Sequence, residues 1–386
     1  VRIRRYNIDM AKRILLVGGG SGGHVYPLIA VARALRDQSK IRGTPVELCI
    51  FGEGGLLKTA AENDGINFKK ISAGKFRRYF SLLAPLDAIK SLVGLIQSLW
   101  SVLWFMPDAV FSKGGYDAVM PCFAAWLYRI PVYTHESDTV PGLANRIIAR
   151  FSKIVFTGFK SAVQNFKSGK AVVVGNPVRQ ELLNGDRTAA MQSFNLSPDL
   201  KTILVMGGSQ GAKEINDIIL ESVVELVANY SVIHQCGQGQ YKSVSVEVEK
   251  ITKEGEGEYG PNVTQRYRLF PFLDGAQMSL AYAAADVIVS RAGSGSLFEI
   301  ASLGKPGIII PLANAANNHQ LANAIEFSKF GGVIIEGSNI TPHILMNQVS
   351  SLLEPTRYSQ VSQQIRQFAT PNAATDIATT ILDATV

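Results

Sequence analysis

A glycine-rich run followed directly by a histidine is the first segment whose residues can do chemistry. The run is Gly18-Gly-Gly-Ser-Gly-Gly23, and it follows the apolar residues 14–17. Glycines at the start of a helix let backbone N–H groups approach an anion at the positive end of the helix dipole. His24 comes next, and an imidazole titrates close enough to neutral pH to take a proton from a hydroxyl group. Two roles are equally open for His24: it acts as a base, or it only orders the loop.

A second small-residue loop lies in the other half of the chain. Gly207-Gly-Ser-Gln-Gly-Ala212 follows the apolar residues 202–206. It can present backbone N–H groups and the Ser209 hydroxyl to a diphosphate. Arg179, near the middle of the chain, can supply a cation to the same group. Turn glycines and a surface arginine are the plainer explanations, but together these features favour a nucleotide site.

The third loop, Ser290-Arg-Ala-Gly-Ser-Gly-Ser-Leu-Phe-Glu-Ile300, follows another apolar run. Residues 294–296 leave room and donors at a helix N-terminus, and Glu299 can accept two hydrogen bonds from a ribose diol. The alternative for Glu299 is a capping box with the serine three residues earlier. Asn317-Asn-His-Gln320 is a polar cluster that suits sugar hydroxyls, although an ordinary turn explains it too.

No residue pattern predicts a metal site or a cofactor. The sequence contains no D-x-D motif, the pattern by which carboxylates would hold a metal ion and a nucleotide sugar. The histidines after His24 show no ligand spacing. The three cysteines, Cys49, Cys122 and Cys236, stand too far apart for a zinc motif or a disulfide framework, which favours a reducing compartment.

The charge of the chain is unevenly distributed. Its 386 residues are 47% hydrophobic, which excludes disorder and gives enough length for two domains. Residues 1–178 carry 24 Lys and Arg against 11 Asp and Glu, whereas residues 179–386 carry 14 against 20. This asymmetry predicts an anionic partner for the first half, either a nucleic acid or a membrane surface.

The residues around positions 69–106 favour a membrane over a nucleic acid. Basic residues between positions 69 and 78 are interleaved with aromatic ones, and the uncharged residues 91–106 follow. A spanning helix needs about 20 apolar residues, so this run is too short to cross a bilayer. We expect an amphipathic helix that lies on an anionic membrane. The alternative is a helix packed wholly on a sheet.

Apolar strand-like runs alternate with helical stretches along the whole chain. The predicted strands are residues 14–17, 47–51, 109–112, 132–135, 154–157, 202–206, 231–235, 287–290 and 307–310. This order predicts the α/β class, with two Rossmann-like parallel-sheet domains facing across a cleft. The domain boundary is placed after residue 178. Residues 1–178 form the N-terminal domain, residues 179–370 form the C-terminal domain, and a last helix over 371–386 is expected to pack on the first domain.

Seven short motifs occur along the chain in an order that resembles a known family. They are Gly19-Gly-Ser-Gly-Gly-His24, Lys113-Gly-Gly-Tyr116, His135-Glu-Ser-Asp138 with Pro141-Gly-Leu-Ala-Asn145, Gly175-Asn-Pro-Val-Arg179, Gly207 to Ala212, Arg291-Ala-Gly293 with Glu299, and His319-Gln320. The set resembles the MurG family of bacterial peptidoglycan glycosyltransferases, over about residues 12–370. The family transfers N-acetylglucosamine from UDP-N-acetylglucosamine to the C4 hydroxyl of undecaprenyl-pyrophosphoryl-muramyl-pentapeptide (lipid I), which gives lipid II.

The resemblance implies a GT-B fold, an inverting mechanism, and neither a cofactor nor an essential metal. It puts the acceptor on the N-terminal domain, the UDP-sugar on the C-terminal domain, and the protein on the cytoplasmic face of the plasma membrane, bound peripherally, with no nucleic acid as partner. His24 is the implied base. The implied substrate contacts are Ser21, Gly22, Gly23, Asp138, Arg179, Ser209, Leu273, Ser294, Gly295, Ser296, Leu297, Phe298, Glu299 and Gln320.

For five of these residues, the resemblance also implies which part of the donor they bind. Arg179 and Ser209 hold the diphosphate, the backbone at Leu273 reads the uracil edge, Glu299 binds the ribose, and Gln320 contacts the sugar hydroxyls. The chain departs from the family pattern at three places. Ser21 replaces a commoner Thr, some members have Asn at the position of Asp138, and some have Gln at the position of His319.

Two other functions are compatible with parts of the sequence. A different GT-B enzyme, such as a diacylglycerol glycosyltransferase, would share the nucleotide loops of the second half but not the segments at Lys113 and His135. A dinucleotide-binding dehydrogenase or a nucleotide-sensing module would use Glu53 as its ribose acid, but this leaves the loops at 207–212 and 291–299 without a role.

Overall fold

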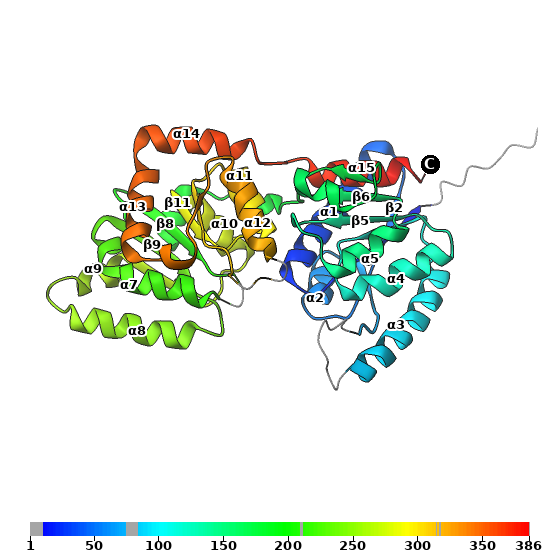
Figure 1. The fold of residues 1–386 in the computed structure, drawn as a ribbon, viewed down its shortest axis with the longest axis horizontal. Helices are drawn as coiled ribbons and strands as arrows, with labels where there is room; N and C mark the ends of the chain where they lie inside the picture. The colour runs from blue at the N-terminus through cyan, green and yellow to red at the C-terminus, as the bar shows by residue number, and fades with distance from the viewer. Residues whose placement is uncertain (1–10, 75–83, 209–210, 314, 316–317, 386) are drawn as a thin grey trace, which may run out of the picture. The chain divides into compact units, whose positions relative to one another are not determined.

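The computed structural model describes residues 11–385 except 75–83, 209–210, 314 and 316–317. The chain divides into two compact units, one formed by Val1–Val178 with Thr370–Val386 and the other by Arg179–Ala369. Each unit contains one parallel sheet with helices packed on it (Figure 1). The predicted pair of Rossmann-like α/β sheets is therefore confirmed.

The sheet of the N-terminal unit has seven strands in the order β3-β2-β1-β4-β5-β6-β7. The strands are β1 (Lys12–Val17), β2 (Val46–Gly52), β3 (Asn67–Lys70), β4 (Ala109–Ser112), β5 (Val132–Glu136), β6 (Ile154–Thr157) and β7 (Ala171–Val173). All neighbours are parallel, and in the register Leu15 lies opposite both Cys49 and Val110. The strand order reverses between β1 and β4, so the chain leaves the sheet centre in opposite directions there.

Side chains alternate between the two faces of this sheet. Ile14 and Leu16 pack in the cluster formed with α1 (Gly22–Arg42), α2 (Leu56–Asn63) and α15 (Ala373–Asp383). Leu15 and Val17 pack on the other face, in the cluster that includes α3 (Ala84–Phe105), α4 (Tyr116–Leu127) and α5 (Leu143–Phe151). Because both faces are covered, the central strands are continuous apolar runs, as is typical of parallel sheets. A short 3-10 helix, η1 (Lys160–Asn165), follows β6.

The C-terminal unit repeats this plan with six strands in the order β10-β9-β8-β11-β12-β13. The strands are β8 (Lys201–Met206), β9 (Tyr230–Gln235), β10 (Tyr267–Phe270), β11 (Val287–Ser290), β12 (Gly307–Ile309) and β13 (Val333–Ile334). The helices are η2 (Gln180–Leu182), α6 (Arg187–Ser193), α7 (Lys213–Asn229), α8 (Tyr241–Glu254), α9 (Gly260–Arg266), α10 (Gly275–Ala284), α11 (Ser294–Leu303), α12 (His319–Ser328), η4 (Gly337–Asn339), α13 (Pro342–Leu353) and α14 (Pro355–Arg366). Here the order reverses between β8 and β11.

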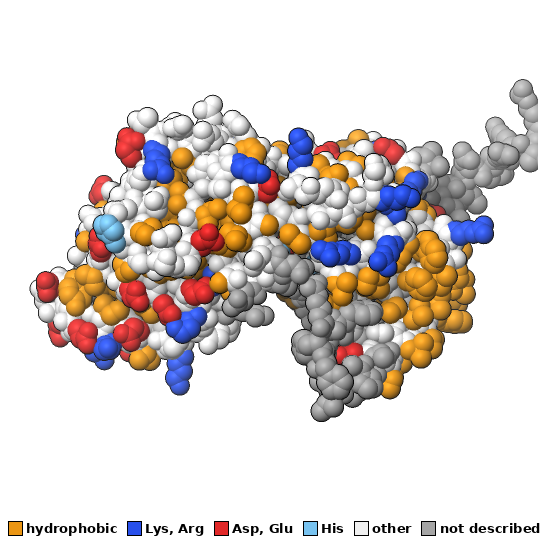
Figure 2. All heavy atoms as spheres, viewed as in Figure 1, with side chains coloured by type: hydrophobic (Ala, Val, Ile, Leu, Met, Phe, Trp, Pro, Cys, Tyr) orange, Lys and Arg blue, Asp and Glu red, His pale blue; other side chains and the backbone are white. Residues whose placement is uncertain are grey.

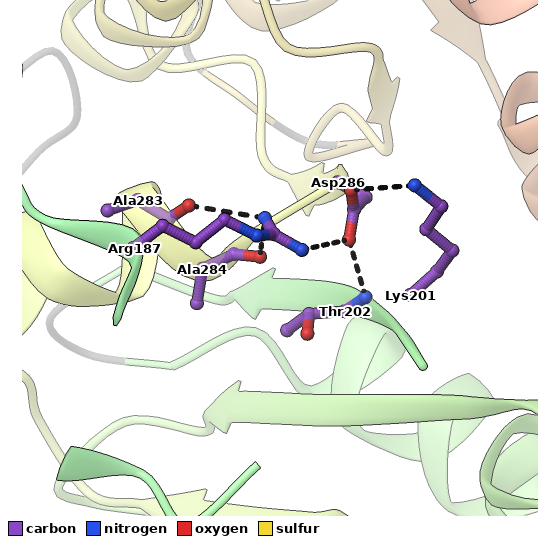
Figure 3. Close-up of polar contacts among 6 residues, drawn as sticks. All are labelled: Arg187, Lys201, Thr202, Ala283, Ala284 and Asp286. Atoms are coloured by element: carbon purple, nitrogen blue, oxygen red, sulfur yellow. Dashed lines mark hydrogen bonds and ion pairs between the residues drawn. The ribbon is translucent and has the colours of Figure 1, made fainter. Parts of the chain in front are cut away.

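A buried carboxylate ties the first strand of this unit to its neighbours (Figure 3). Asp286 is 5% exposed, and its Oδ2 accepts hydrogen bonds from Thr202 N at 2.8 Å and Arg187 Nη2 at 3.1 Å. Lys201 Nζ lies 3.5 Å from the other oxygen, Oδ1. Arg187 Nη1 also donates to the carbonyl oxygen of Ala284 at 2.7 Å. The cluster joins β8, α6 and the end of α10, and a buried charge that is satisfied in this way is costly to disturb.

Helix α3 exposes many of its apolar side chains. Ile89, Leu92, Ile96, Trp100 and Trp104 are each about 60% exposed or more, whereas Ser98 and Ser101 of the same helix are buried. The exposed residues recur every three or four positions, so they form one stripe along the helix. Among the described residues, no helix combines the length and the apolar character that crossing a membrane requires.

Candidate functional site

Loops from two strands meet at the point where the strand order of the N-terminal unit reverses. The loop after β1 holds the predicted glycine run, and the loop after β4 begins at Lys113. Gly19 N donates to the carbonyl oxygen of Gly114 at 2.8 Å. Gly115 has a φ of 93°, and a Cβ there would come within 2.7 Å of the Gly19 Cα, so only glycine fits. In open parallel sheets, this edge is where ligands bind.

His24 lies in the first turn of α1, directly after the glycine loop that follows β1. Its ring is half-buried, and its Nδ1 lies 2.8 Å from Oγ of Ser21, the residue that caps the helix. The pKa of His24 is lowered to about 4, first by burial and then by the charge of Lys113, while the charge of Asp138 opposes both effects. The imidazole is therefore neutral at physiological pH, and its ring position is fixed by a hydroxyl group. Gly22 is half-buried and Gly23 is exposed in the same turn.

The sequence HES at the end of β5 supplies three buried polar side chains. His135 Nε2 lies 2.8 Å from the carbonyl oxygen of Gly175, and burial takes the pKa of His135 well below its ordinary value. Glu136 Oε2 accepts hydrogen bonds from Gly142 N and from Asn145 Nδ2. Ser137 Oγ donates to Asn176 Oδ1 at 3.1 Å. These bonds fix the loop that follows the strand.

Asp138 lies half-buried in that loop, at the same strand edge as His24. The Glu136 carboxylate accepts a hydrogen bond from Asp138 N at 2.9 Å, which holds the loop in a tight turn. Burial, and then the charge of Asp138, raises the pKa of Glu136 to about 7. The structure thus brings Ser21, Lys113 and Asp138 near His24 at this strand edge. Lys113, Glu136 and Asn145 lie at the same strand edge, which follows from the pairing of β1 with β4 and of β4 with β5.

The glycine loops of the C-terminal unit also lie at a reversal of strand order. The loop after β8 starts at Gly207, and the loop after the adjacent β11 leads into α11. Gln235, at the end of β9, connects the first of these to a third segment: its Nε2 donates to Gly208 O, and its Oε1 accepts from Leu273 N at 3.2 Å. The N–H of Leu273 is therefore used within the protein. Ser209 lies outside the described residues.

Helix α11 begins at Ser294 with Gly293 as its capping residue, and no side chain caps it. The N–H groups of the first turn are thus left for a ligand or water. Ser294 is buried, while Gly295 and Ser296 are half-buried. The side chains of Leu297 and Phe298 are at most 1% exposed, which leaves only their backbone for a ligand.

Glu299 is held by two partners one turn into the helix. Its Oε1 accepts from Arg179 Nε at 3.0 Å, and its Oε2 accepts from Tyr282 OH at 2.8 Å. The carboxylate is nearly buried, with 10% of its side chain exposed, against 19% for Arg179. A capping box with Ser296 is not formed, because Gly293 caps the helix. The structure therefore brings Arg179 and Glu299 together as one ion pair beside the α11 N-terminus.

Gln320 stands at the start of α12, where its Oε1 accepts a hydrogen bond from Leu312 N at 3.0 Å. Next to it lies a cavity of about 710 Å³ between α7, the segment after β12 and η4. Four carboxylates line this cavity, from Glu214, Asp217, Glu221 and Glu336. Such a lining does not suit a diphosphate. Among the residues that the structure describes, no three His, Cys, Asp or Glu side chains are grouped so that they could hold a metal ion.

Comparison with known proteins identifies the family. Residues 14–157 match the glycosyltransferase family 28 N-terminal domain, and residues 202–380 match the glycosyltransferase family 28 C-terminal domain. A protein of Clostridium kluyveri named UDP-N-acetylglucosamine--N-acetylmuramyl-(pentapeptide) pyrophosphoryl-undecaprenol N-acetylglucosamine transferase is 35% identical, over 88% of this chain and 91% of its own. The chain belongs to this transferase family. A relative of the same name from Treponema pallidum is 34% identical, over 97% of this chain and 96% of its own.

Solved structures agree with this membership of the transferase family. The crystal structure of Acinetobacter baumannii MurG matches with a TM-score of 0.71 and 25% identity, over 96% of this chain and 99% of that one. A UDP-GlcNAc 2-epimerase from Neisseria meningitidis, bound to UDP-GlcNAc, matches with a TM-score of 0.69 at 16% identity, which shows the shared fold alone. The predicted GT-B fold and the predicted family are therefore confirmed, and the chain is a glycosyltransferase.

Proposed function

We propose that this chain transfers N-acetylglucosamine from UDP-N-acetylglucosamine to the C4 hydroxyl of the muramyl sugar of lipid I, which forms lipid II. The names of relatives that are 34–35% identical along nearly their whole length support this reaction. The observation that carries the proposal is that each unit has its own glycine-lined site at a reversal of strand order. Two such sites suit a reaction between two substrates, whereas a dehydrogenase would bind its dinucleotide at one of them and leave the glycine loops of the other without a role.

The C-terminal unit is proposed to bind the donor. The uncapped first turn of α11, at Ser294, Gly295 and Ser296, suits the α-phosphate, with the backbone of Leu297 and Phe298 completing the turn. Glu299, one turn later, is proposed to accept hydrogen bonds from the ribose hydroxyls, and Arg179, which donates to Glu299, is proposed to bind the diphosphate. The backbone near Leu273 is proposed for the uracil edge, Ser209 for the diphosphate, and Gln320 for the sugar.

The N-terminal unit is proposed to bind the acceptor and to supply the base. For Nε2 of His24 to accept a proton, the ring must carry its hydrogen on Nδ1 and donate it to Ser21 Oγ, which lies 2.8 Å away. The muramyl C4 oxygen then attacks the anomeric carbon as its proton passes to Nε2. The bond from that carbon to the diphosphate breaks, and its electron pair leaves with UDP. A single displacement of this kind inverts the α-linkage to β.

Charge on the departing UDP is proposed to be stabilised by backbone N–H groups and Arg179 rather than by a metal ion. In the N-terminal unit, Gly22 and Gly23 are proposed to leave the first turn of α1 open to substrate. Asp138, whose charge acts on His24, is proposed to stabilise the imidazolium that forms during transfer.

The exposed stripe of α3 is proposed to bind the surface of an anionic membrane, from its cytoplasmic side. Figure 2 shows hydrophobic side chains gathered where Figure 1 places α3 and α4. Trp126 and Leu127 at the end of α4 are each 48% exposed and extend the apolar area, while Lys90 of α3 is exposed among these residues. Exposed tryptophans beside basic residues are typical of interfacial helices. An undecaprenyl-linked acceptor is itself confined to a membrane, which agrees with this placement.

The choice of acceptor is the direct test of this function. The protein is incubated with radiolabelled UDP-N-acetylglucosamine and either lipid I or diacylglycerol, and the label in the lipid fraction is counted. We expect lipid I alone to accept the sugar. Label transferred to diacylglycerol and not to lipid I would assign the chain to another branch of lipid glycosylation.

A further inference from the structure

Lys113 is a buried ammonium without an ion pair among the described residues. It follows β4 directly, is 1% exposed, and donates a hydrogen bond to Ser137 Oγ. Its ammonium has three hydrogens, and burying such a charge outside an ion pair is costly. A charge buried at such a cost points to a function in its surroundings.

The backbone of the first glycine loop lies between Lys113 and His24. A Cβ on Gly18 would lie 3.6 Å from the Lys113 Cβ, and one on Gly19 would lie 3.2 Å from Nδ1 of His24. The two consecutive glycines therefore border the first carbon of the lysine side chain and the imidazole, and a side chain at Gly19 would crowd the ring. Because neither glycine carries a side chain, this part of the loop places no polar side chain between the two residues that could screen their electrostatic interaction.

The charged groups at this strand edge shift the pKa values of Lys113, His24 and His135. From β5 and its loop, Glu136 and Asp138 raise the pKa of Lys113, although burial lowers it to about 8 overall. The Lys113 charge in turn lowers the pKa values of His24 and of His135. The ammonium thus remains mostly charged at neutral pH, while both imidazoles stay neutral.

Two further carboxylates belong to elements beside the loop. Glu53 follows β2 and is exposed, and its N–H donates to the Asp117 carboxylate in the first turn of α4. Asp138 is the carboxylate whose charge favours the protonated imidazole of His24, and Lys113 is the cation that opposes it.

We propose that Lys113 is a positioning residue for the transfer: its buried ammonium holds Ser137 and the loop of Asp138 in place and keeps His24 in the unprotonated form that a base requires. The proposal rests on the proposed function, in which His24 is the base. A purely structural lysine would instead only hold Ser137, which already bonds Asn176.

The test compares two variants through the pH dependence of kcat/KM for transfer to lipid I. Lys113→Met keeps the length of the side chain and removes its charge. Ser137→Ala removes the hydrogen bond and keeps the charge. We expect the acid limb of the profile to move up by about one pH unit or more in Lys113→Met, because the nearby carboxylates then act unopposed. In Ser137→Ala, the rate changes but the limb stays in place.

The proposal is overturned if the acid limb of the kcat/KM profile stays in place in Lys113→Met and the rate falls equally at every pH. Lys113 would then have only a structural role. If Lys113→Met does not fold, the wild-type protein decides the matter by NMR. The ring resonance of His24, assigned by its loss in His24→Asn, should shift near pH 8 as Lys113 loses its proton. Absence of that shift overturns the proposal. The NMR readout needs no activity, so a wild-type protein that fails to glycosylate lipid I refutes the proposed function separately.

Discussion

At the scale of single residues, His24 has the environment of a base. It is neutral, it is oriented by Ser21, and it stands at the sheet edge where ligands bind. We predict that His24→Ala lowers kcat by about 10²–10⁴-fold, because general bases contribute this much. Affinity for UDP, measured by titration calorimetry, should not change.

The chain offers a matched control for this substitution. His343 lies exposed on α13 and contacts Asn347, so His343→Ala should keep full activity. Near-normal turnover of His24→Ala would remove His24 from the role of base.

Glu299 makes a second prediction possible at this scale. Glu299→Ala should weaken UDP binding by about 10–100-fold, because hydrogen bonds to a charged group contribute about 1.5–3 kcal/mol. Tyr282→Phe is the control, since it removes one hydrogen bond to the carboxylate but keeps the carboxylate and Arg179. Calorimetry on both variants separates ribose binding from support of the helix. Equal losses in the two would mean that Glu299 acts only through its packing.

The sequence indicated these residues unevenly. Glycine loops and the residues beside them, such as His24 and Glu299, are visible because loop and helix N-terminus are adjacent in the chain. The roles of Lys113 and Glu136 are not visible, because they depend on which strands pair. The ion pair between Arg179 and Glu299 joins residues 120 positions apart, and no local pattern predicts it.

At the scale of elements, the Asp286 cluster makes the start of β8 sensitive to one carboxylate. Asp286→Asn removes the charge that Arg187 and Lys201 share (Figure 3). We predict a loss of about 1–3 kcal/mol in the stability of the C-terminal unit, since the hydrogen bonds to this buried side chain lose the contribution of its charge. Calorimetry measures this loss, and hydrogen exchange at the Thr202 amide locates it.

The exposed pair of Arg42 and Asp383 provides the comparison. Asp383→Asn should cost less than about 1 kcal/mol, because exposed pairs contribute little. If both variants lose the same stability, burial of Asp286 is not the cause.

Helix α3 gives a prediction about membranes. The double substitution Ile96→Ser and Trp100→Ser should reduce co-sedimentation with anionic vesicles at least 10-fold, because each buried apolar side chain contributes about 1.5–3 kcal/mol. Binding of the wild type should fall as salt is added. Val246→Ser, at a 57% exposed position on α8, should bind like the wild type. Equal wild-type binding to neutral vesicles at any salt concentration would contradict the electrostatic part of the proposal.

The elements that the sequence predicted best are those of the sheet centres. Strands β4, β6 and β11 have the predicted bounds, because a strand buried on both faces is a plain apolar run. Strand β3 has the sequence NFKK and β13 has two residues, and both lie at sheet edges. Because β3 is polar and β13 is only two residues long, neither forms a long apolar run that would predict a strand. Helix α3 starts seven residues before the predicted stretch, because its first turns include the charged Asp87 and Lys90.

At the scale of the whole molecule, the proposed transfer depends on two units that bind different substrates. The N-terminal unit carries the excess of basic residues, the exposed stripe of α3 and His24, whereas the C-terminal unit carries the uncapped α11 and the pair of Arg179 with Glu299. The return of the chain to the first unit through α15, which packs on α1, makes the N-terminal unit discontinuous in sequence. Repetition of one fold with different loop residues explains how similar sheets can hold unlike substrates.

The most direct measurement is the structure of the product made by the purified chain from lipid I and UDP-N-acetylglucosamine. We expect one UDP to be released for each sugar transferred, and NMR to show a β-linkage to C4 of the muramyl residue. The yield should be the same when a chelator is present. An α-linkage, or a reaction abolished by the chelator and restored by a divalent ion, would contradict a single metal-free displacement.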